Sequence, residues 1–405
     1  MMDLLIKNAV IATPKGNAPV VGENVKIFNG NIGIINGKIA HIGEEVQVKQ
    51  GVACEANVPK ARKVIDADGR LVTPGLVDSH THLVFGGFRQ HEFSKKIEGI
   101  PYLDILKAGG GILSTVEATR STSSEELYEK AKGFLQTMRD HGTTTVEAKS
   151  GYGLDFETEM KQLKVVKRLQ NEGFNVISTF MGAHAVPKNK TADDFINEVI
   201  ESLPKVKDYA EFVDIFCEEG VFTVAQSEKL LKEAKKLGFG IKIHADEINN
   251  LGGSTLAAKL GAISAEHLIE ANEKDIEEMS KAGTIAILLP ATSFYLNKPY
   301  AKAKTMIKKG QAIAIATDFN PGSSPNFNLQ LTMNIACIKY RLTPKEVLTS
   351  VTLNAACGIN RADSIGTIEI GKNADIVIWN APDLDFLFYA YGSNKVYKTI
   401  TSFEK

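Results

Sequence analysis

Cysteine is scarce in this sequence, with four among 405 residues. The four stand far apart and form no Cys-x-x-Cys pair: they are Cys54, Cys217, Cys337 and Cys357. Such scattered thiols exclude a disulfide framework and are typical of reduced cysteines in a cytoplasmic protein. A chain of this length can bury a large core, so it needs no covalent cross-links to stay folded.

Long apolar runs and an excess of charge of one sign are also missing. No stretch approaches the roughly 20 apolar residues that a membrane helix requires. The N-terminal stretch MMDLLIKNAVIATPKG alternates like a strand and lacks the apolar core of a signal peptide. The formal net charge is -1. We therefore expect a cytoplasmic protein with neither a nucleic-acid partner nor a membrane partner.

The long middle part of the sequence alternates apolar runs with charged, helix-like stretches. Such alternation predicts repeated β-α units and a parallel sheet. Eight runs qualify as strands: LVDSHTHL, TTTVEAKSGYG, NVISTFMGAH, FVDIFCEEG, IKIHADE, AISAEHL, TIAILLPATS and AIAIATDFNPG. Eight strands close a (β/α)8 TIM-type barrel, whereas an open doubly wound sheet usually has fewer. The predicted fold class is α/β, with residues 71–363 as the barrel.

The two ends of the chain have the pattern of β structure. The segment IFNGNIGIINGKIAHIGEE has short alternating runs broken by Asn-Gly pairs, a strong hairpin signal, and GTIEIGKNADIVIWN near the C-terminus also resembles strands. We expect residues 1–70 and 364–405 to build one small composite β-sandwich domain. Two unrelated β extensions are the alternative, since periodicity alone does not pair distant strands.

Polar or ionisable residues end nearly every predicted barrel strand: His82, Lys149, His184, Glu218, His244, His267 and Asp318. A parallel barrel gathers the carboxyl ends of its strands at one mouth, where its chemistry lies. The first strand leads into PGLVDSHTHLVF, where His80 and His82 stand one residue apart and point to the same side. Two imidazoles side by side are half of a metal site for zinc or iron.

Later strands supply the other half of this metal site. His244 follows an apolar strand in IKIHADE, and Asp318 follows small and apolar residues in AIATDFNPG. Either residue alone has an ordinary structural interpretation, and so has a bare pair of histidines. Three imidazoles and one carboxylate at one barrel mouth, however, predict a catalytic metal centre made by His80, His82, His244 and Asp318.

These motifs resemble the metal-dependent amidohydrolase superfamily over nearly the whole chain. The shared pattern is PGLVDSHTHL, a histidine on a later strand, His267 on the next, Asp318 on the last, and Gly-x-Ile-x-x-Gly-Lys-x-Ala-Asp near the C-terminus. Within the superfamily, the chain is similar to the imidazolonepropionase family through HTHLVFGGFRQHEF, YLDILKAGGGILSTVEATR, EAKSGYGL, MGAHAVP, HADE and TDFNPGSSP.

The resemblance implies a homodimeric hydrolase of histidine degradation that opens 4-imidazolone-5-propanoate to N-formimidoyl-L-glutamate. It also implies one divalent or trivalent metal per chain, zinc or iron. Asp318 would bind the metal and accept a proton from water, His267 would steady the oxyanion, and Glu247 would carry a proton to the ring nitrogen. Which of Asp318 and His267 first takes the proton is open. A plain helix-terminal residue is the alternative for Glu247.

The implied substrate carries a propionate, so its site needs a cation or a row of donors. Arg89 in GGFRQ can grip a carboxylate with two hydrogen bonds, with a surface arginine as the plain alternative. The turn DFNPGSS could present backbone N–H groups. By resemblance, substrate and product contacts come from Arg89, Tyr102, Tyr152, His184, Glu247, Asn320, Gly322 and Ser323.

A lysine at a strand end and a run of three glycines have no assigned part in the predicted reaction, and two other functions are alternatives. Lys149 ends a strand where some relatives carry a carboxylated lysine between two metals; since the resemblance implies one metal, we interpret it as structural or electrostatic. Gly109, Gly110 and Gly111 lack the ending of a phosphate loop and predict a lid or a loop near the mouth. The rivals are another cyclic-amide hydrolase or ring deaminase of the superfamily, and a silent barrel used for assembly, which the intact metal motifs disfavour.

Overall fold

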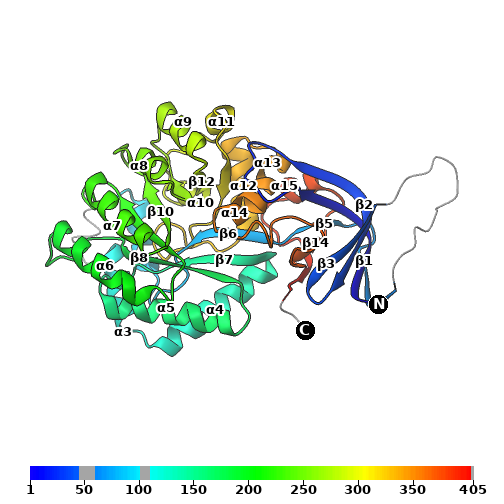
Figure 1. The fold of residues 1–405 in the computed structure, drawn as a ribbon, viewed down its shortest axis with the longest axis horizontal. Helices are drawn as coiled ribbons and strands as arrows, with labels where there is room; N and C mark the ends of the chain where they lie inside the picture. The colour runs from blue at the N-terminus through cyan, green and yellow to red at the C-terminus, as the bar shows by residue number, and fades with distance from the viewer. Residues whose placement is uncertain (45–59, 101–109, 403–405) are drawn as a thin grey trace.

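The structure is a computed structural model that describes residues 1–44, 60–100 and 110–402. Figure 1 shows two parts: a barrel of strands covered by helices, and a sheet at one end of the molecule to which both ends of the chain contribute. Within the described ranges, no helix is both long enough and apolar enough to cross a membrane.

The barrel is one sheet of eight parallel strands in chain order, from β6 to β13. Its strands are β6 (Leu76–Thr81), β7 (Thr143–Lys149), β8 (Val176–Ala183), β9 (Phe212–Cys217), β10 (Gly240–Ala245), β11 (Ser264–His267), β12 (Ile285–Leu288) and β13 (Ile313–Ile315). Each corresponds to one of the eight runs expected from the sequence, so the predicted α/β barrel is confirmed. Their side chains are almost all buried, as expected where helices cover the outside and side chains fill the inside.

The barrel closes where the residues after β13 meet the end of β6. Thr81 and Phe319 form a parallel bridge, and the His82 amide donates to the Phe319 carbonyl at 2.8 Å. In the same seam, the Asp78 carboxylate accepts from the Thr317 amide at 3.0 Å and from its hydroxyl at 2.6 Å. The first and last strands are thus joined beside the predicted metal ligands.

Helices connect the strands, and several begin at caps that the sequence encodes. Ser123 with Glu126, and Thr223 with Gln226, form capping boxes that start α4 and α7. The helices of the barrel part are η1 (Gln90–Glu92), α1 (Phe93–Ile97), α3 (Ile112–Ser121), α4 (Ser124–Asp140), α5 (Phe156–Asn171), α6 (Ala192–Val206), α7 (Val224–Lys236), α8 (Gly253–Leu260), α9 (Glu273–Ala282), α10 (Pro290–Tyr295), α11 (Ala303–Lys308), α12 (Leu329–Tyr340), α13 (Pro344–Val351) and α14 (Leu353–Cys357).

The terminal sheet has seven strands in the order β15-β14-β5-β1-β2-β3, with β4 also paired to β1. Its elements are β1 (Met2–Pro14), β2 (Val25–Ile35), β3 (Lys38–Glu44), β4 (Ala61–Asp66), β5 (Leu71–Pro74), β14 (Ile376–Trp379), α15 (Leu384–Tyr389) and β15 (Val396–Ile400). The expected hairpin is β2–β3, where Asn36 and Gly37 have φ of 51° and 71°, the left-handed pair of a type I′ turn. Both termini therefore share one sheet, while the division at residues 70 and 363 stays a prediction.

Trp379 joins the terminal sheet to the barrel. Its side chain is fully buried, and its Nε1 donates to Thr73 Oγ1 at 2.9 Å. Gly142, just before β7, has φ of 91° and leaves room for the indole, since a Cβ there would lie 2.9 Å from the ring. Trp379 belongs to the same apolar cluster as Leu384 of α15 and Leu163 of α5. One core therefore spans both parts of the molecule.

Candidate metal centre

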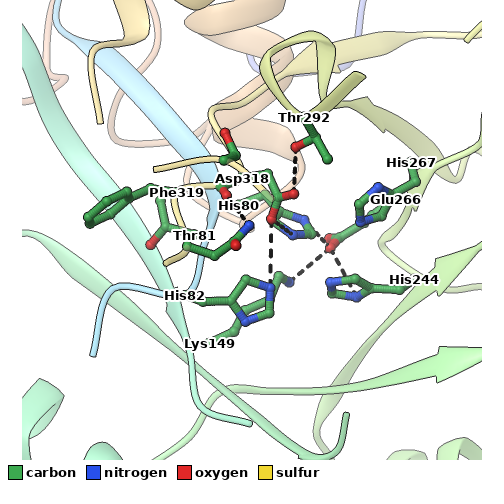
Figure 2. A network of polar contacts seen from close by, with 12 residues as sticks. His80, Thr81, His82, Lys149, His244, Glu266, His267, Thr292, Asp318 and Phe319 are labelled. Atoms are coloured by element: carbon green, nitrogen blue, oxygen red, sulfur yellow. Dashed lines mark hydrogen bonds and ion pairs between the residues drawn. The ribbon is translucent and has the colours of Figure 1, made fainter. Parts of the chain in front are cut away.

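Four side chains from distant parts of the chain converge at the barrel mouth, as Figure 2 shows. His80 lies near the end of β6 and His82 just beyond it, His244 is on β10, and Asp318 follows β13 by three residues. All four are buried, with at most 3% of their surface exposed. Closing the barrel therefore brings the four predicted metal ligands together.

The carboxylate of Asp318 lies close to two of these histidines. Its Oδ1 is 3.3 Å from His80 Nε2 and 3.8 Å from His82 Nε2. The ring centroids of His80 and His244 are 4.6 Å apart. Two overlapping groups have ligand atoms within 4.8 Å of one another: His80, His82 and Asp318, and His80, His244 and His267. This spacing suits one cation held between imidazoles and a carboxylate.

The hydrogen bonding of the imidazoles shows that these residues fit a metal ion. Five of their buried nitrogens make no hydrogen bond within the described structure: both ring nitrogens of His80, both of His244, and Nδ1 of His82. Buried polar atoms are nearly always paired, so unpaired ones in a converging cluster indicate a partner of another kind. Neutral imidazoles with a carboxylate are a donor set for zinc or iron. The mouth is thus arranged to bind a metal.

Two residues at the mouth have strained backbones. Asp318 has φ of 52° and His267 has φ of 71°, in the left-handed region that non-glycine residues rarely adopt. The barrel seam holds Asp318 in this conformation, because its amide donates to the His80 carbonyl at 3.1 Å. Such strain costs about 1–3 kcal/mol per residue and concentrates at functional sites. Here it accompanies side chains that face the metal cluster (Figure 2).

Burial and neighbouring charges set the protonation of Asp318 and His267. Asp318 accepts a hydrogen bond from Thr292 Oγ1 at 2.6 Å. Burial opposes its ionisation, but the contacts with His80 outweigh burial and lower the pKa of Asp318 to about 2. Burial also lowers the pKa of His267 to about 3. At neutral pH the mouth therefore holds an ionised carboxylate, which can accept a proton, and a neutral imidazole, which can donate a hydrogen bond.

Glu247 is the protonated acid of the mouth. It follows β10 by two residues, and its Oε1 lies 3.6 Å from His267 Nδ1. Burial and the negative charges of Asp318 and Glu218 raise the pKa of Glu247 to about 8. Glu218 also fixes this loop, since its carboxylate accepts from the Ile248 amide at 2.9 Å. A carboxyl group that keeps its proton at pH 7 can give that proton to a leaving group.

His184 and Tyr152 form an aromatic wall beside His82. The His184 ring stacks on His82 with centroids 4.8 Å apart and an interplanar angle of 15°. The Tyr152 ring is buried, 5.4 Å from that of His184. Burial lowers the pKa of His184 to about 3, so its ring is neutral, and its Nδ1 donates to the Gly151 carbonyl at 3.0 Å. Two predicted substrate residues thus lie directly against a predicted metal ligand.

Arg89 lies against the turn that follows Asp318. A Cβ on Gly322 would sit 0.9 Å from Arg89 Nη2, so the guanidinium lies in the space that a larger side chain at this position would fill. Arg89 Nε is buried and forms no hydrogen bond with any described residue. The Asn320 Oδ1 accepts from the amides of Gly322 at 2.8 Å and Ser323 at 2.7 Å. These two N–H groups, expected to face a carboxylate, are used inside the turn in this structure.

Two of the predicted positions, Tyr102 and Gly109, lie outside the described residues. Gly111 is described: it caps the start of α3 with φ of 73°, and its amide donates to the buried Glu92 carboxylate at 2.6 Å. A lid built from this glycine run stays a prediction.

Comparison with known proteins gives the family. The Amidohydrolase family model matches residues 71–402. The imidazolonepropionase of Bacillus mycoides (strain KBAB4) is 51% identical over 376 residues, covering 91% of this chain and 87% of that protein. The imidazolonepropionase of Bacillus cytotoxicus is 49% identical over 408 residues, covering 98% and 95%. The chain belongs to the imidazolonepropionase family of amidohydrolases.

Solved structures share the fold of this imidazolonepropionase-family chain. An adenosine deaminase of Xanthomonas campestris with bound zinc has a TM-score of 0.73 at 18% identity, covering 99% of this chain and 92% of the deaminase. A 5-methylcytosine deaminase of Klebsiella pneumoniae has a TM-score of 0.74 at 15% identity, covering 99% and 96%. Likeness at such identity concerns the fold alone.

The sequence analysis missed charged residues beneath the metal cluster of this imidazolonepropionase-family barrel. They lie inside strands with at most 1% exposure: Glu147, Asp214, Lys242 and Glu266, beside Lys149, which was expected to be structural or electrostatic. The signal was present as charge at alternate strand positions, Glu147-x-Lys149 on β7 and Lys242-x-His244 on β10. A period of two puts each pair on one side of its strand, which here faces inward.

Proposed function

We propose that this chain is an imidazolonepropionase, which hydrolyses the ring C–N bond of 4-imidazolone-5-propanoate and releases N-formimidoyl-L-glutamate in histidine degradation. The Bacillus relatives, about half identical over most of the chain, are imidazolonepropionases. The observation that carries the mechanism is the geometry of the mouth, where the Asp318 carboxylate faces His80 and His82 and the Glu247 carboxyl lies 3.6 Å from His267. Burial and neighbouring negative charges raise the pKa of Glu247 to about 8, whereas the contacts with His80 outweigh burial and lower that of Asp318 to about 2. Opening a cyclic amide needs a base for the water and an acid for the leaving nitrogen.

Four residues would hold the metal, one zinc or iron ion per chain, divalent or trivalent: His80, His82, His244 and Asp318. When bound, the ion supplies Lewis acidity that activates water and polarises the ring carbonyl. Thr292 donates to Asp318 Oδ2, and Oδ1 is the atom nearest His80 Nε2 and His82 Nε2. The Thr292 hydroxyl therefore orients the carboxylate toward the histidines.

We assign the proton movements to Asp318, His267 and Glu247, with Asp318 chosen over His267 as the base because its carboxylate is ionised and faces the metal-binding histidines. Asp318 accepts a proton from the attacking water as the water oxygen bonds to the ring carbonyl carbon. His267, which is neutral, donates a hydrogen bond to the oxyanion of the tetrahedral intermediate. The C–N bond then breaks, and Glu247 gives its proton to the departing ring nitrogen. The product carries a new carboxylate where the ring carbonyl stood.

Arg89 is the residue we assign to the substrate propionate. Its guanidinium lies beside the turn that leaves the metal cluster, and its buried Nε has no hydrogen-bond acceptor among the described residues. A carboxylate would supply that acceptor. The remaining substrate and product contacts are assigned to Tyr102, Tyr152, His184, Glu247, Asn320, Gly322 and Ser323.

The assembly and location of the enzyme are also proposals. We assign it to the cytoplasm as a homodimer, consistent with sparse cysteines and with the family resemblance described above. Another cyclic-amide hydrolase, or a ring deaminase, is the alternative function. An unpaired arginine at the mouth favours an anionic substrate over a neutral base.

Turnover of 4-imidazolone-5-propanoate tests this proposal, followed as loss of its ultraviolet absorbance with metal content assayed on the same sample. We expect ring opening by the wild type and its loss in E247Q with the metal retained. A metal-loaded wild-type protein that leaves the ring intact would overturn the substrate assignment and direct the search to other cyclic amides and aminated rings.

A further inference from the structure

A buried cation lies among three carboxylates directly beneath the metal cluster. Lys149 Nζ is 2.8 Å from Glu147 Oε1, 2.8 Å from Asp214 Oδ2 and 2.9 Å from Glu266 Oε2. All four side chains have 0% exposure. We call these four residues the Lys149 cage. Carboxylate oxygens surrounding one buried point resemble a cation site, and here the cation is an ammonium group.

The ammonium of Lys149 compensates the buried negative charge of the Lys149 cage. Lys242 pairs with Glu147 Oε1 at 3.0 Å and with Glu266 Oε1 at 2.9 Å, and makes no ion pair with Asp214 in the described structure. Three carboxylates therefore face two ammonium groups, leaving one excess negative charge. Burial opposes the charge on Lys149, but the three carboxylates outweigh burial and hold its pKa well above the usual value. Removing this ammonium would leave buried carboxylates uncompensated.

Two carboxylates of the cage also contact metal-binding histidines. Asp214 Oδ2 lies 3.0 Å from His244 Nδ1, and Glu266 forms an ion-pair contact with His80 Nδ1. Figure 2 shows Glu266 between the histidines and Lys149. Neither Nδ1 has hydrogen-bond geometry in this structure, but a carboxylate beside Nδ1 attracts the ring proton to that nitrogen, which fixes the imidazole tautomer and leaves Nε2 for the metal. The Nε2 of His80 does face the Asp318 carboxylate, at 3.3 Å.

The same carboxylates would otherwise be metal ligands themselves. Asp214, His244 and Glu266 have ligand atoms within 4.8 Å of one another, a third group able to hold an ion. Lys149 Nζ contacts both carboxylates of this group through their Oδ2 and Oε2 atoms. Its ammonium therefore occupies the space between the two carboxylates of this group.

We propose that Lys149 is a built-in cation of the centre: it fills the cage that a second metal ion would enter, and it keeps Asp214 and Glu266 as acceptors for His244 and His80. Lys149 is thus a positioning residue that makes the centre mononuclear. This inference rests on the metal centre of the proposed function. Its experiments count or titrate bound metal without substrate, so a wrong substrate assignment would leave their results unchanged.

The first experiment compares K149A with K149Q, which lose the same charge but differ in the room they leave. The purified chains are stripped of metal, titrated with Zn²⁺ alone, desalted and analysed for zinc per chain. We expect one zinc in the wild type and in K149Q, where the amide fills the cage, and two in K149A. A folded K149A that binds one zinc, or a K149Q that binds two, would overturn the proposal.

The second experiment tests the other half of the proposal, that the cage carboxylates position the metal-binding histidines, and it needs no substitution of Lys149. D214N and E147Q each remove one buried negative charge beside Lys149, but of the two residues Asp214 is the one in contact with a metal-binding histidine. Zn²⁺ affinity is measured by competition with a chelator, with circular dichroism to check folding. We expect D214N to bind zinc about tenfold more weakly or worse, the usual effect of losing such a partner, and E147Q to stay within about threefold of the wild type. Equal affinities for the two variants would refute the positioning role.

Discussion

Glu247 shows how a single side chain acquires its chemistry from its surroundings. The pKa of a glutamate side chain in water is about 4.3. Here burial and the charges of Asp318 and Glu218 raise its pKa to about 8. The Glu218 carboxylate also holds the loop that carries it, through the Ile248 amide. The same residue type on the surface would be a base at neutral pH, whereas here it is an acid.

The pH profile of turnover tests the acid role of Glu247. Because its pKa is raised to about 8, the proton-bearing form dominates below that pH and is lost as pH rises through it. We expect kcat to fall about tenfold per pH unit above about pH 8 in the wild type. The residual activity of E247Q should lack this alkaline limb. A wild-type kcat that stays level to pH 9.5 would contradict the assignment.

Substitution of Arg89 tests its proposed contact with the propionate of the substrate. Loss of a charge-assisted, bidentate carboxylate contact costs about 1.5–3 kcal/mol, which corresponds to about 10- to 150-fold in kcat/KM. We expect R89M to show this loss with 4-imidazolone-5-propanoate and R89K to lie between R89M and the wild type. An imidazolone that lacks the propionate is the control substrate. R89M should turn it over as the wild type does; an equal loss on both substrates would mean that Arg89 acts on the fold of the mouth.

At the scale of elements, the seam between β6 and the residues after β13 fixes the site. Asp78 accepts two hydrogen bonds from Thr317 across this seam, although burial raises the pKa of Asp78 to about 7. D78A would leave a buried amide and a buried hydroxyl without their acceptor. We expect a loss of about 2–4 kcal/mol in the free energy of unfolding, measured by urea denaturation.

T317V is the companion variant for the seam. It removes the hydroxyl, which donates to Asp78 and accepts from the Phe319 amide at 3.1 Å, and it keeps the Thr317 amide donor. We expect T317V to lower the free energy of unfolding by about 1 kcal/mol, less than D78A does. A loss in T317V as large as that in D78A would show that the hydroxyl, with its contacts to Asp78 and Phe319, stabilises the seam more than the Thr317 amide bond does.

The strands of the barrel and its four predicted ligands could be read from the sequence because the signals are local. An apolar run that ends in His82, His244 or Asp318 shows both the strand and the mouth. For the Lys149 cage the sequence shows only alternating charge within two strands, and it does not show which residues pair across the barrel. Charged residues inside a strand look solvent-exposed, and their partners come from neighbouring strands that only the closed barrel brings together. The room that Gly322 makes for Arg89 is equally non-local.

At the scale of the whole molecule, one core joins the terminal sheet to the barrel through Trp379. W379A would leave a large cavity between Thr73 and Gly142. We expect a loss of about 3–5 kcal/mol in unfolding free energy, in a single transition for both parts. The control Y389A, at a residue that is 83% exposed, should stay within about 0.5 kcal/mol of the wild type. Two separate transitions in W379A would show that the sheet folds on its own.

Closure of the seam determines when the four proposed metal ligands come together. During synthesis, the three histidines leave the ribosome well before Asp318, and β6 has no neighbour on its open side until the residues after β13 arrive. A nascent or truncated chain therefore has loose imidazoles without the carboxylate. The complete set of four proposed ligands therefore exists only once the barrel has closed.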